Sequence, residues 1–376
     1  MNYAAGYKAT YYAEILDPLS WTEQDRLEIK SGSVKRNNKD LRQTAELDVT
    51  DFDQAKEVWI RIYMDARQNE NVTHNALFTG IVSAPETKIE GAAVTRPLQC
   101  YSVLKPCEDI TLERGWYAGA GENGAAVLRR LLAVSPAPIV IEDNAPALSD
   151  YIVAEDDETN LSMIDKVLDA MDWRLDIDGD GTIEIGSKPI QPAAVFSATG
   201  VDVIESSLSI KRDWFSCPNV FRATSGDLIA VARDDDPNSP LSTVGRGREI
   251  VKAENNVTLS SDEGIAEYAA RRLKEEQKVA ESADYARRFT PDLNIGDVVR
   301  MAYDEIEGDY TIDEQSIELT YGGRTSEKVS RTVKQERAEE LVQKKTWALV
   351  VLPDNKIFVM PDGNKVLVPW TTMIHS

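Results

Sequence analysis

The sequence has few of the side chains that most often carry out catalysis, since its 376 residues include two histidines and three cysteines. His74 lies in a polar stretch with no candidate nucleophile near it, and His375 is one residue from the end. Cys100, Cys107 and Cys217 are too few for a disulfide framework, and the first two have the wrong spacing for zinc. We therefore expect buried thiols, no catalytic residues, no metal ligands, no cofactor and no enzymatic activity.

Long apolar runs and basic charge are also scarce. No apolar run approaches the roughly 20 residues that span a bilayer, and residues 1–4 begin no basic-then-apolar signal segment, so we expect no signal peptide and no stable membrane insertion. The 42 Lys and Arg face 64 Asp and Glu, for a formal net charge of -22. This acidity disfavours general nucleic-acid binding and favours solubility before assembly. It would equally suit the wall of a channel through which DNA passes without sticking.

Two glycine-containing motifs resemble ligand sites. Residues 119–124 match the Gly-x-Gly-x-x-Gly dinucleotide fingerprint, and Glu142 follows at the end of an expected strand. The preceding residues 112–118 are weakly apolar and contain a glycine, so the motif favours a surface loop over a nucleotide site. Residues 176–182 resemble the start of a calcium loop, but Ser187 stands where a bidentate glutamate is needed, which favours a tight hairpin.

Two charged stretches receive a similar interpretation. Residues 233–240 carry three adjacent aspartates, whose side chains diverge, so a solvated loop is favoured over a cation site. Residues 245–248, Gly-Arg-Gly-Arg, form a basic patch that is too short for nucleic-acid readout and could pair with an acidic neighbouring subunit.

Alternating apolar residues predict short strands at both ends of the chain and an α/β segment between them. Expected strands of the first hundred residues are 27–30, 44–49, 57–64, 78–82 and 98–101, with turns at 31–33 and 67–71. The middle segment has expected helices at 124–133 and from about 159, a strand at 138–141, and a hairpin formed by 173–177 and 182–185. Thr159 or Asn160 could cap the second helix.

The second half returns to strands, expected at 207–210, 220–223, 228–231, 285–289, 298–303, 309–312 and 317–321. One helix interrupts them after residues 260–263, which have the form of a capping box. Residues 327–345 are charged and are predicted to be helical. The apolar stretches 347–352, 356–360 and 365–370, separated by Pro/Asp/Asn turns, predict a terminal β-meander.

The predicted fold class is therefore mixed, β-rich α+β. We expect a first β-barrel domain at residues 1–107, an α/β insertion at 108–194, a second β-barrel domain at 195–326, and a helix plus β-meander at 327–376.

Several stretches in this order resemble the tail and baseplate hub proteins of long-tailed phages, prophages and phage-derived bacteriocins. They are Phe-Thr-Gly-Ile-Val at 78–82, Asn-Val-Phe at 219–221 with the acidic Pro/Ser loop 234–240, Tyr-Ala-Ala-Arg-Arg-Leu at 268–273, the Leu and Gly-Asp-Val-Val of 291–299, and Gly-Asp-Tyr-Thr-Ile at 308–312. The resemblance covers about residues 10–325 and leaves the terminal meander outside.

The resemblance implies two tube-like β-barrel domains per chain, so that a homotrimer would form a ring of pseudo-sixfold symmetry. Such a ring would join the tail tube or distal tail protein above to a spike, tip or fibre protein below, with the tape-measure protein as a further partner. DNA would pass through its lumen without specific binding. The protein would be assembled in the host cytoplasm and located in the virion, at the tail tip or baseplate.

Two alternatives stay open from the residues alone. With 64 acidic residues, a cell-wall hydrolase that uses two carboxylates about 5 to 10 Å apart is one. A carbohydrate-binding tail protein is the other, and it would require exposed aromatic platforms, whereas the seven tryptophans lie mostly in apolar strands.

Overall fold

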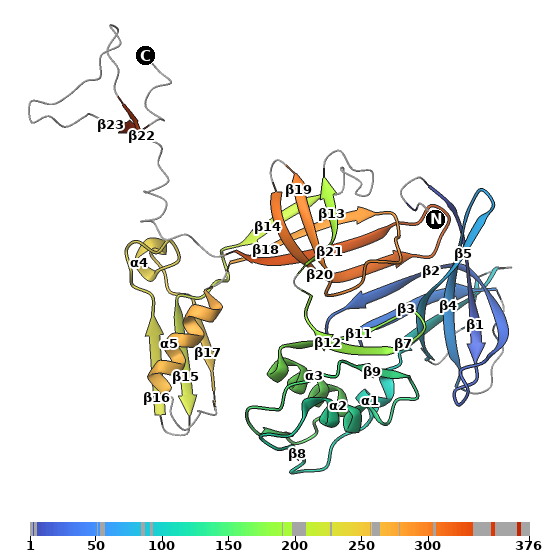
Figure 1. Cartoon of the computed structure of the whole chain (residues 1–376), viewed down its shortest axis with the longest axis horizontal. Coiled ribbons are helices and arrows are strands. Elements are labelled where there is room, and N and C mark those ends of the chain that lie inside the picture. The colour runs from blue at the N-terminus through green and yellow to red at the C-terminus, as the bar shows by residue number, and fades with distance from the viewer. Residues whose placement is uncertain are drawn as a thin grey trace, which may run out of the picture. The chain divides into compact units, whose positions relative to one another are not determined.

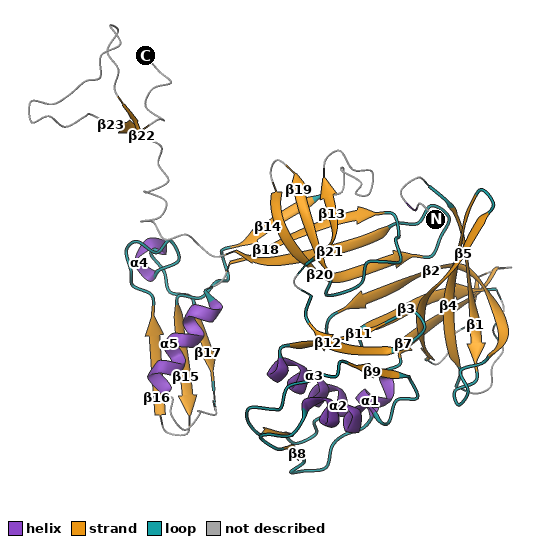
Figure 2. Cartoon of the chain, in the orientation of Figure 1, coloured by secondary structure: helices purple, strands orange, loops and turns teal. Residues whose placement is uncertain are grey.

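In the computed structural model, the chain divides into a larger unit, Met1–Ile210 with Ser282–Arg331, and a smaller unit, Lys211–Glu281 with Thr332–Ser376. The structure describes residues 3, 6–50, 52, 57–83, 87–90, 93–189, 191–197, 208–225, 228–255, 257, 264–277, 279–303, 306–333, 347–349 and 367–369. Strands predominate among them, which confirms the β-rich fold class (Figure 2).

The first sheet of the larger unit closes on itself as an antiparallel barrel. Its strands are β1 (Lys8–Leu16), β2 (Glu23–Asn37), β3 (Gln43–Val49), β4 (Trp59–Gln68), β5 (Asn71–Val82) and β7 (Ala93–Ser102). They pair in the order β1-β4-β5-β7-β3-β2, and β2 pairs with β1 again. Every second residue of β4 points inward, and Ile60, Ile62 and Met64 are fully buried. A short strand, β6 (Lys88–Glu90), forms a hairpin with the start of β7.

The sequence located five of these seven strands but missed β1 and β6 and misread one turn. Residues 31–33, expected as a turn because of Gly32, continue β2 as a strand. The pairing of β2 with β3 shifts by one residue between Ile29 and Ser31, so a β-bulge bends β2 without ending it.

The second sheet of the larger unit has the order β13-β19-β20-β21-β18-β14. Its strands are β13 (Pro192–Ser197), β14 (Ser209–Asp213), β18 (Val279–Arg287), β19 (Val298–Tyr303), β20 (Ile306–Glu318) and β21 (Thr325–Val333). Phe196, Tyr285, Met301, Tyr310 and Ile312 form its core. The sequence predicted separate strands at 309–312 and 317–321, but β20 is continuous, since a bulge between Ile312 and Glu314 again replaces a turn.

The predicted helix at 327–345 is wrong over its first seven residues, which belong to β21. Thr325, Glu327 and Val329 alternate inward and are buried, so their spacing follows the period of a strand. Residues 334–346 lie outside the described residues. In the terminal segment, β22 (Trp347–Leu349) and β23 (Leu367–Pro369) pair antiparallel, and the expected strand at 356–360 lies outside the described residues.

The α/β segment between the two sheets contains α1 (Lys105–Asp109), β8 (Tyr117–Ala118), α2 (Gly124–Leu132), β9 (Ile139–Ile141), β10 (Ile152–Val153), α3 (Asn160–Met171), β11 (Trp173–Ile177) and β12 (Ile183–Ser187). Its helices gather on one side in Figure 2. Leu128 and Leu131 of α2 share a core with Ile164 of α3. The hydroxyl of Thr159 accepts a hydrogen bond from the Ser162 N–H, which confirms the predicted cap.

The smaller unit contains β15 (Val220–Ser225), β16 (Leu228–Arg233), α4 (Thr243–Arg246), β17 (Val251–Glu254) and α5 (Ile265–Glu276). Phe221 and Ala223 of the sheet pack against Ala269 and Leu273 of α5. The sequence located most of these elements but did not separate them from the strands of the second β-domain. Residues 260–263, the expected capping box, lie outside the described residues.

The two sheets of the larger unit repeat one strand order. When the strands of each sheet are taken in chain order, β1, β2, β3, β4, β5 and β7 correspond to β13, β14, β18, β19, β20 and β21. Every neighbour pair of the second sheet then has its counterpart in the first. One difference is that β13 runs parallel to β19, whereas β1 is antiparallel to β4. The chain therefore contains the same six-strand arrangement twice.

A test of the first barrel uses Gly80, where β5 approaches β7. A Cβ added at Gly80 would lie 2.1 Å from the Tyr101 carbonyl oxygen, whereas nothing lies within 4 Å of a Cβ at Gly119. We expect Gly80→Ala to lower the free energy of unfolding by about 1–3 kcal/mol, because backbone has to shift. Gly119→Ala is the matched control and should change it little. Urea unfolding followed by tryptophan fluorescence checks both, and equal midpoints would contradict this packing.

Candidate functional site: the junction of the two sheets

The two sheets are joined edge to edge by two long strands (Figure 1). The first part of β2 pairs with β1, and its last five residues, from Ser33 to Asn37, pair antiparallel with residues from Glu318 to Glu314 of β20. Likewise, the first part of β20 pairs with β19. Each of these two strands therefore pairs with one neighbour in its own sheet and then with the other sheet. In each strand, the bulge lies just before the residues that pair across the junction.

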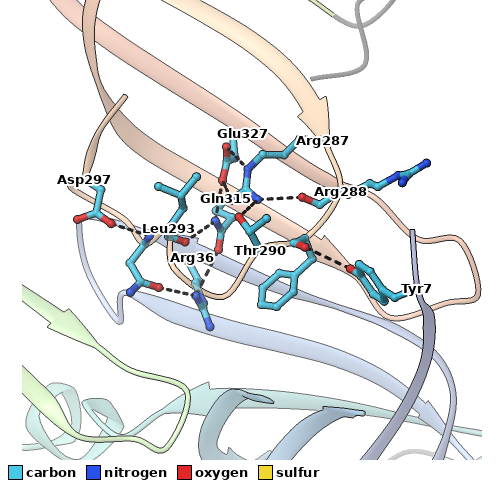
Figure 3. Close-up of polar contacts among 11 residues, drawn as sticks. Tyr7, Arg36, Arg287, Arg288, Thr290, Leu293, Asp297, Gln315 and Glu327 are labelled. Atoms are coloured by element: carbon cyan, nitrogen blue, oxygen red, sulfur yellow. Dashed lines mark hydrogen bonds and ion pairs between the residues drawn. The ribbon is translucent and has the colours of Figure 1, made fainter. Parts of the chain in front are cut away.

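A buried ion pair lies beside this junction (Figure 3). The Arg287 guanidinium of β18 donates from Nε to Glu327 Oε2 at 2.8 Å and from Nη2 to Oε1 at 2.5 Å. The two side chains are 1% and 0% exposed. Such a pair lies in a medium where either charge alone would be strongly unfavourable, so each one requires the other.

Gln315 of β20 connects this ion pair to β2. Its Nε2 donates to Glu327 Oε1 at 2.7 Å, and its Oε1 accepts from Arg36 Nη1 at 3.3 Å. Arg36 stands opposite Gln315 in the β2–β20 register. Its Nη2 donates to the Leu77 carbonyl of β5 at 2.6 Å, and Nη1 also reaches Asn294 Oδ1 at 3.1 Å. One hydrogen-bonded chain thus runs from the second sheet into the first barrel (Figure 3).

The same network fixes the loop that follows β18. Arg287 Nη1 donates to the Arg288 carbonyl at 2.9 Å and to Thr290 Oγ1 at 2.7 Å. The Tyr7 hydroxyl, which precedes β1, donates to the Phe289 carbonyl at 3.2 Å (Figure 3). Burial raises the pKa of Tyr7, so its hydroxyl stays a donor. The loop is therefore held from both sheets.

The α/β segment supplies further charge to the junction. Asp176 of β11 interacts electrostatically with the buried Arg36, whose pKa is lowered by burial. Burial raises the pKa of Asp176 to about 6, an effect that Arg36 opposes. Arg174 of the same strand donates to the Ile295 carbonyl at 2.9 Å and forms an ion pair with Asp297 at 3.3 Å. β11 thus contacts the loop that leads into β19 of the second sheet.

The motif that resembled a calcium loop is the turn of the β11–β12 hairpin, as predicted. Asp178 Oδ1 accepts from the Thr182 N–H at 2.8 Å. The turn docks on the first barrel, since Thr79 Oγ1 donates to the Gly179 carbonyl at 2.8 Å. A Cβ at Gly179 would lie 1.9 Å from the Ala76 carbonyl oxygen, which explains the glycine. In the described part of the chain, no group of three or more His, Cys, Asp or Glu could hold a metal ion.

The motif that resembled a dinucleotide fingerprint is a loop closed by its own side chains. Glu122 Oε2 accepts from the Gly119 N–H at 3.0 Å, and its other oxygen pairs with Arg130 at 3.0 Å. The Asn123 side chain caps α2 by accepting from the Ala126 N–H at 3.2 Å. A carboxylate therefore lies where a phosphate would bind, and the preceding β8 is only a two-residue strand of an antiparallel pair.

The charged stretches of the smaller unit are bound within that unit. Asp234 Oδ2 accepts from Ser239 Oγ at 2.6 Å and from Gln277 Nε2 at 2.9 Å, which makes the acidic stretch an internally bonded loop. Arg246 donates to the Cys217 carbonyl at 2.7 Å, and Arg248 donates to the Phe215 carbonyl at 3.1 Å. The predicted basic patch thus binds backbone of its own unit.

The structure explains the surroundings of the three cysteines and of His74. All three cysteines are buried and unpaired, as expected, and burial raises the pKa of Cys100 and of Cys107 to about 12. His74 lies on the surface of β5, where its Nδ1 is 2.7 Å from Asp65 Oδ1 of the adjacent β4. His375 lies outside the described residues. No helix within the described ranges is long and apolar enough to cross a membrane.

The fold of two joined sheets, with an α/β segment between them in the chain, is also found in solved structures of tail proteins. No family model and no curated protein matches the chain. It is similar to the tail protein from Neisseria meningitidis MC58 at 14% identity and a TM-score of 0.60, over 86% of this chain and 97% of that one. It is also similar to the 43 kDa tail protein of prophage MuSo2 from Shewanella oneidensis, at 13% identity and a TM-score of 0.61, over 87% and 98% of the two chains.

A third similar structure is the prophage tail protein gp18 from Listeria monocytogenes EGD-e, at 12% identity and a TM-score of 0.50, over 89% of this chain and 98% of that one. The resemblance to phage tail proteins stated from the sequence is therefore confirmed at the level of the fold.

The junction network was missed from the sequence. Arg36 and Arg287 were not singled out from the sequence, and Glu327 was assigned to a charged helix. The signal that could have found Glu327 is its period-two spacing with Thr325 and Val329. The partners of a buried charge depend on pairings between distant segments, which periodicity does not contain.

The buried ion pair can be tested by a double-mutant cycle. Arg287→Met alone leaves the Glu327 carboxylate buried without its partner, so we expect a loss of about 3–5 kcal/mol in the free energy of unfolding. Adding Glu327→Leu should recover a large part of that loss, since no charge then remains buried.

The exposed pair Arg300 and Asp309 is the matched control, because both residues also lie on neighbouring strands of the second sheet. The corresponding cycle there should show little coupling. Urea unfolding measures both cycles. Equal coupling in the two would mean that the buried pair does not hold the junction.

Proposed function

We propose that the protein is a structural hub of a phage tail or baseplate, and that three copies form a ring of pseudo-sixfold symmetry. The observation that carries this proposal is the repeat of one six-strand arrangement within a single chain, joined edge to edge. Three such chains would supply six similar sheets, which match a sixfold tail tube on one side and a threefold spike or fibre on the other. The fold likeness to phage tail proteins supports the same role.

In this role the chain acts by binding other proteins and requires no chemistry. The tail tube or distal tail protein would dock above, the spike, tip or fibre protein below, and the tape-measure protein would be a further partner. The formal net charge of -22 would keep the lumen from retaining DNA. In this role, the domains predicted from the sequence, 1–107, 108–194, 195–326 and 327–376, would be two tube domains with an insertion and an extension. The site of action would be the virion, after assembly in the host cytoplasm.

Mass in solution tests the ring first. We expect size exclusion with light scattering to give three times 41.8 kDa, and electron microscopy of that species to give a ring with an open channel. A species that stays at one chain mass over the accessible concentration range would contradict a self-closing trimer.

A carbohydrate-binding role is a second candidate, supported by one exposed aromatic pair. Tyr117 of β8 and Tyr151 before β10 are both exposed, with ring centroids 6.2 Å apart. Sugars stack on such rings, so fragments of bacterial cell-wall glycan are the probe, with titration of tyrosine fluorescence as the readout.

A further inference from the structure

The repeat of strand order is accompanied by a repeat of sequence at one strand. Residues 33–37 at the end of β2 read Ser-Val-Lys-Arg-Asn, and residues 209–213, the whole of β14, read Ser-Ile-Lys-Arg-Asp. The two strands occupy the same place in their sheets, β2 beside β3 and β14 beside β18. In the first copy of this sequence, the strand forms the junction with β20.

The strand on the other side of the junction is repeated as well. The last part of β20 reads Ser-Ile-Glu at residues 316–318 and forms a hairpin with β21, in which Ile317 pairs with Thr325. In the first sheet, β5 and then β6 both pair with β7, so β6 corresponds to the last part of β20. It reads Lys-Ile-Glu at residues 88–90 and forms the corresponding hairpin with β7, in which Ile89 pairs with Val94. Ile89 thus corresponds to Ile317, and Ile210 of β14 corresponds to Val34 of β2.

The two corresponding pairs of residues differ in how much of each side chain is exposed. Val34 and Ile317 stand opposite each other across the β2–β20 junction and are 0% and 1% exposed. Their counterparts Ile210 and Ile89 are 42% and 71% exposed. The chain therefore buries one copy of the apolar pair within itself and leaves both members of the second copy exposed. Each lies on a short strand that pairs with one neighbour among the described strands, β6 with β7 and β14 with β18.

We propose that β14 of one copy pairs antiparallel with β6 of a second copy, with Ile210 opposite Ile89, in the register that Val34 and Ile317 adopt within the chain. The proposal rests on the ring proposed above and identifies the surfaces that close it. Two different strands meet at this contact, so it is head-to-tail, and repetition of one rotation closes it into a ring. In a trimer, three junctions within chains would alternate with three junctions between chains.

Cysteine cross-linking tests this register in the full-length protein. In Ile89→Cys/Ile210→Cys, the two thiols would face each other across an antiparallel pair, where Cα atoms lie about 4.5–5.5 Å apart, a span that a disulfide bridges. Oxidised glutathione accepts the two electrons as the disulfide forms. We expect covalent dimers and trimers on a non-reducing gel, which dithiothreitol converts to single chains. The three native cysteines are buried, so the parent protein should give no such bands.

Ile89→Cys/Ile229→Cys is the matched control, because Ile229 of β16 is an isoleucine exposed to a similar extent, 68%, on a strand outside both sheets. It should give no covalent trimer. A second variant, Ile89→Lys, places a charge on the proposed contact while leaving the single chain unstrained. It should raise the dissociation constant of the trimer by about tenfold or more, with an unchanged thermal midpoint at concentrations where the parent is monomeric.

The outcomes separate the two proposals. If Ile89→Cys/Ile210→Cys forms a trimer without an intersubunit disulfide, or if Ile89→Lys leaves the trimer intact, the strand pairing is overturned while the hub function stands. The absence of a trimer in the parent protein counts against the ring and the strand pairing together. Equal cross-linking in the matched control would show random collision and would also overturn the assigned register.

Discussion

The pairing of β2 with β20 is the constraint on which the larger unit depends, because it converts two separate sheets into one hydrogen-bonded array. The cost of this arrangement is that polar side chains at the crossing are removed from water. The chain offsets much of that cost with hydrogen-bond partners: the Arg287–Glu327 ion pair, Gln315 as a bridge, and a backbone carbonyl for Arg36, whose Nε is buried without a partner. Each group is held by a different strand, so the network forms only when both sheets are in register.

The α/β segment contributes to the same junction from outside. The turn of its β11–β12 hairpin docks on Ala76 and Thr79 of the first barrel, while Arg174 binds the loop that leads into β19 of the second sheet. A segment that contacts both sheets limits the angle between them. The insertion between the two halves of the repeat thus holds the sheets in position relative to each other. Its aspartates and glycines are explained by close packing. That explanation removes the reason for regarding them as a metal site.

The local sequence pattern was sufficient to predict the helices and strands whose buried residues recur at regular spacing. The capped helix α3, the β11–β12 hairpin and the long strand β4 were all predicted from spacing and turn chemistry. The errors share one cause: Gly32 and the region near Asp313 were taken as breaks, whereas bulges carry β2 and β20 through them. A bulge is stabilised by the partner strand, so its presence depends on long-range pairing. For the same reason, the charged start of β21 was taken for a helix, although its buried Glu327 is satisfied by Arg287 from another strand.

The two bulges also have a geometric consequence. Each lies where a strand passes from one neighbour to the next, and a bulge bends its strand at that point. In a closed assembly the sum of such turns has to equal one full revolution, and the number of copies follows from the size of the individual turn. The number of copies in the proposed ring would then depend on how strongly the extra residues near positions 30 and 313 bend their strands. It would be a property of strand curvature within one chain and not of a contact between chains.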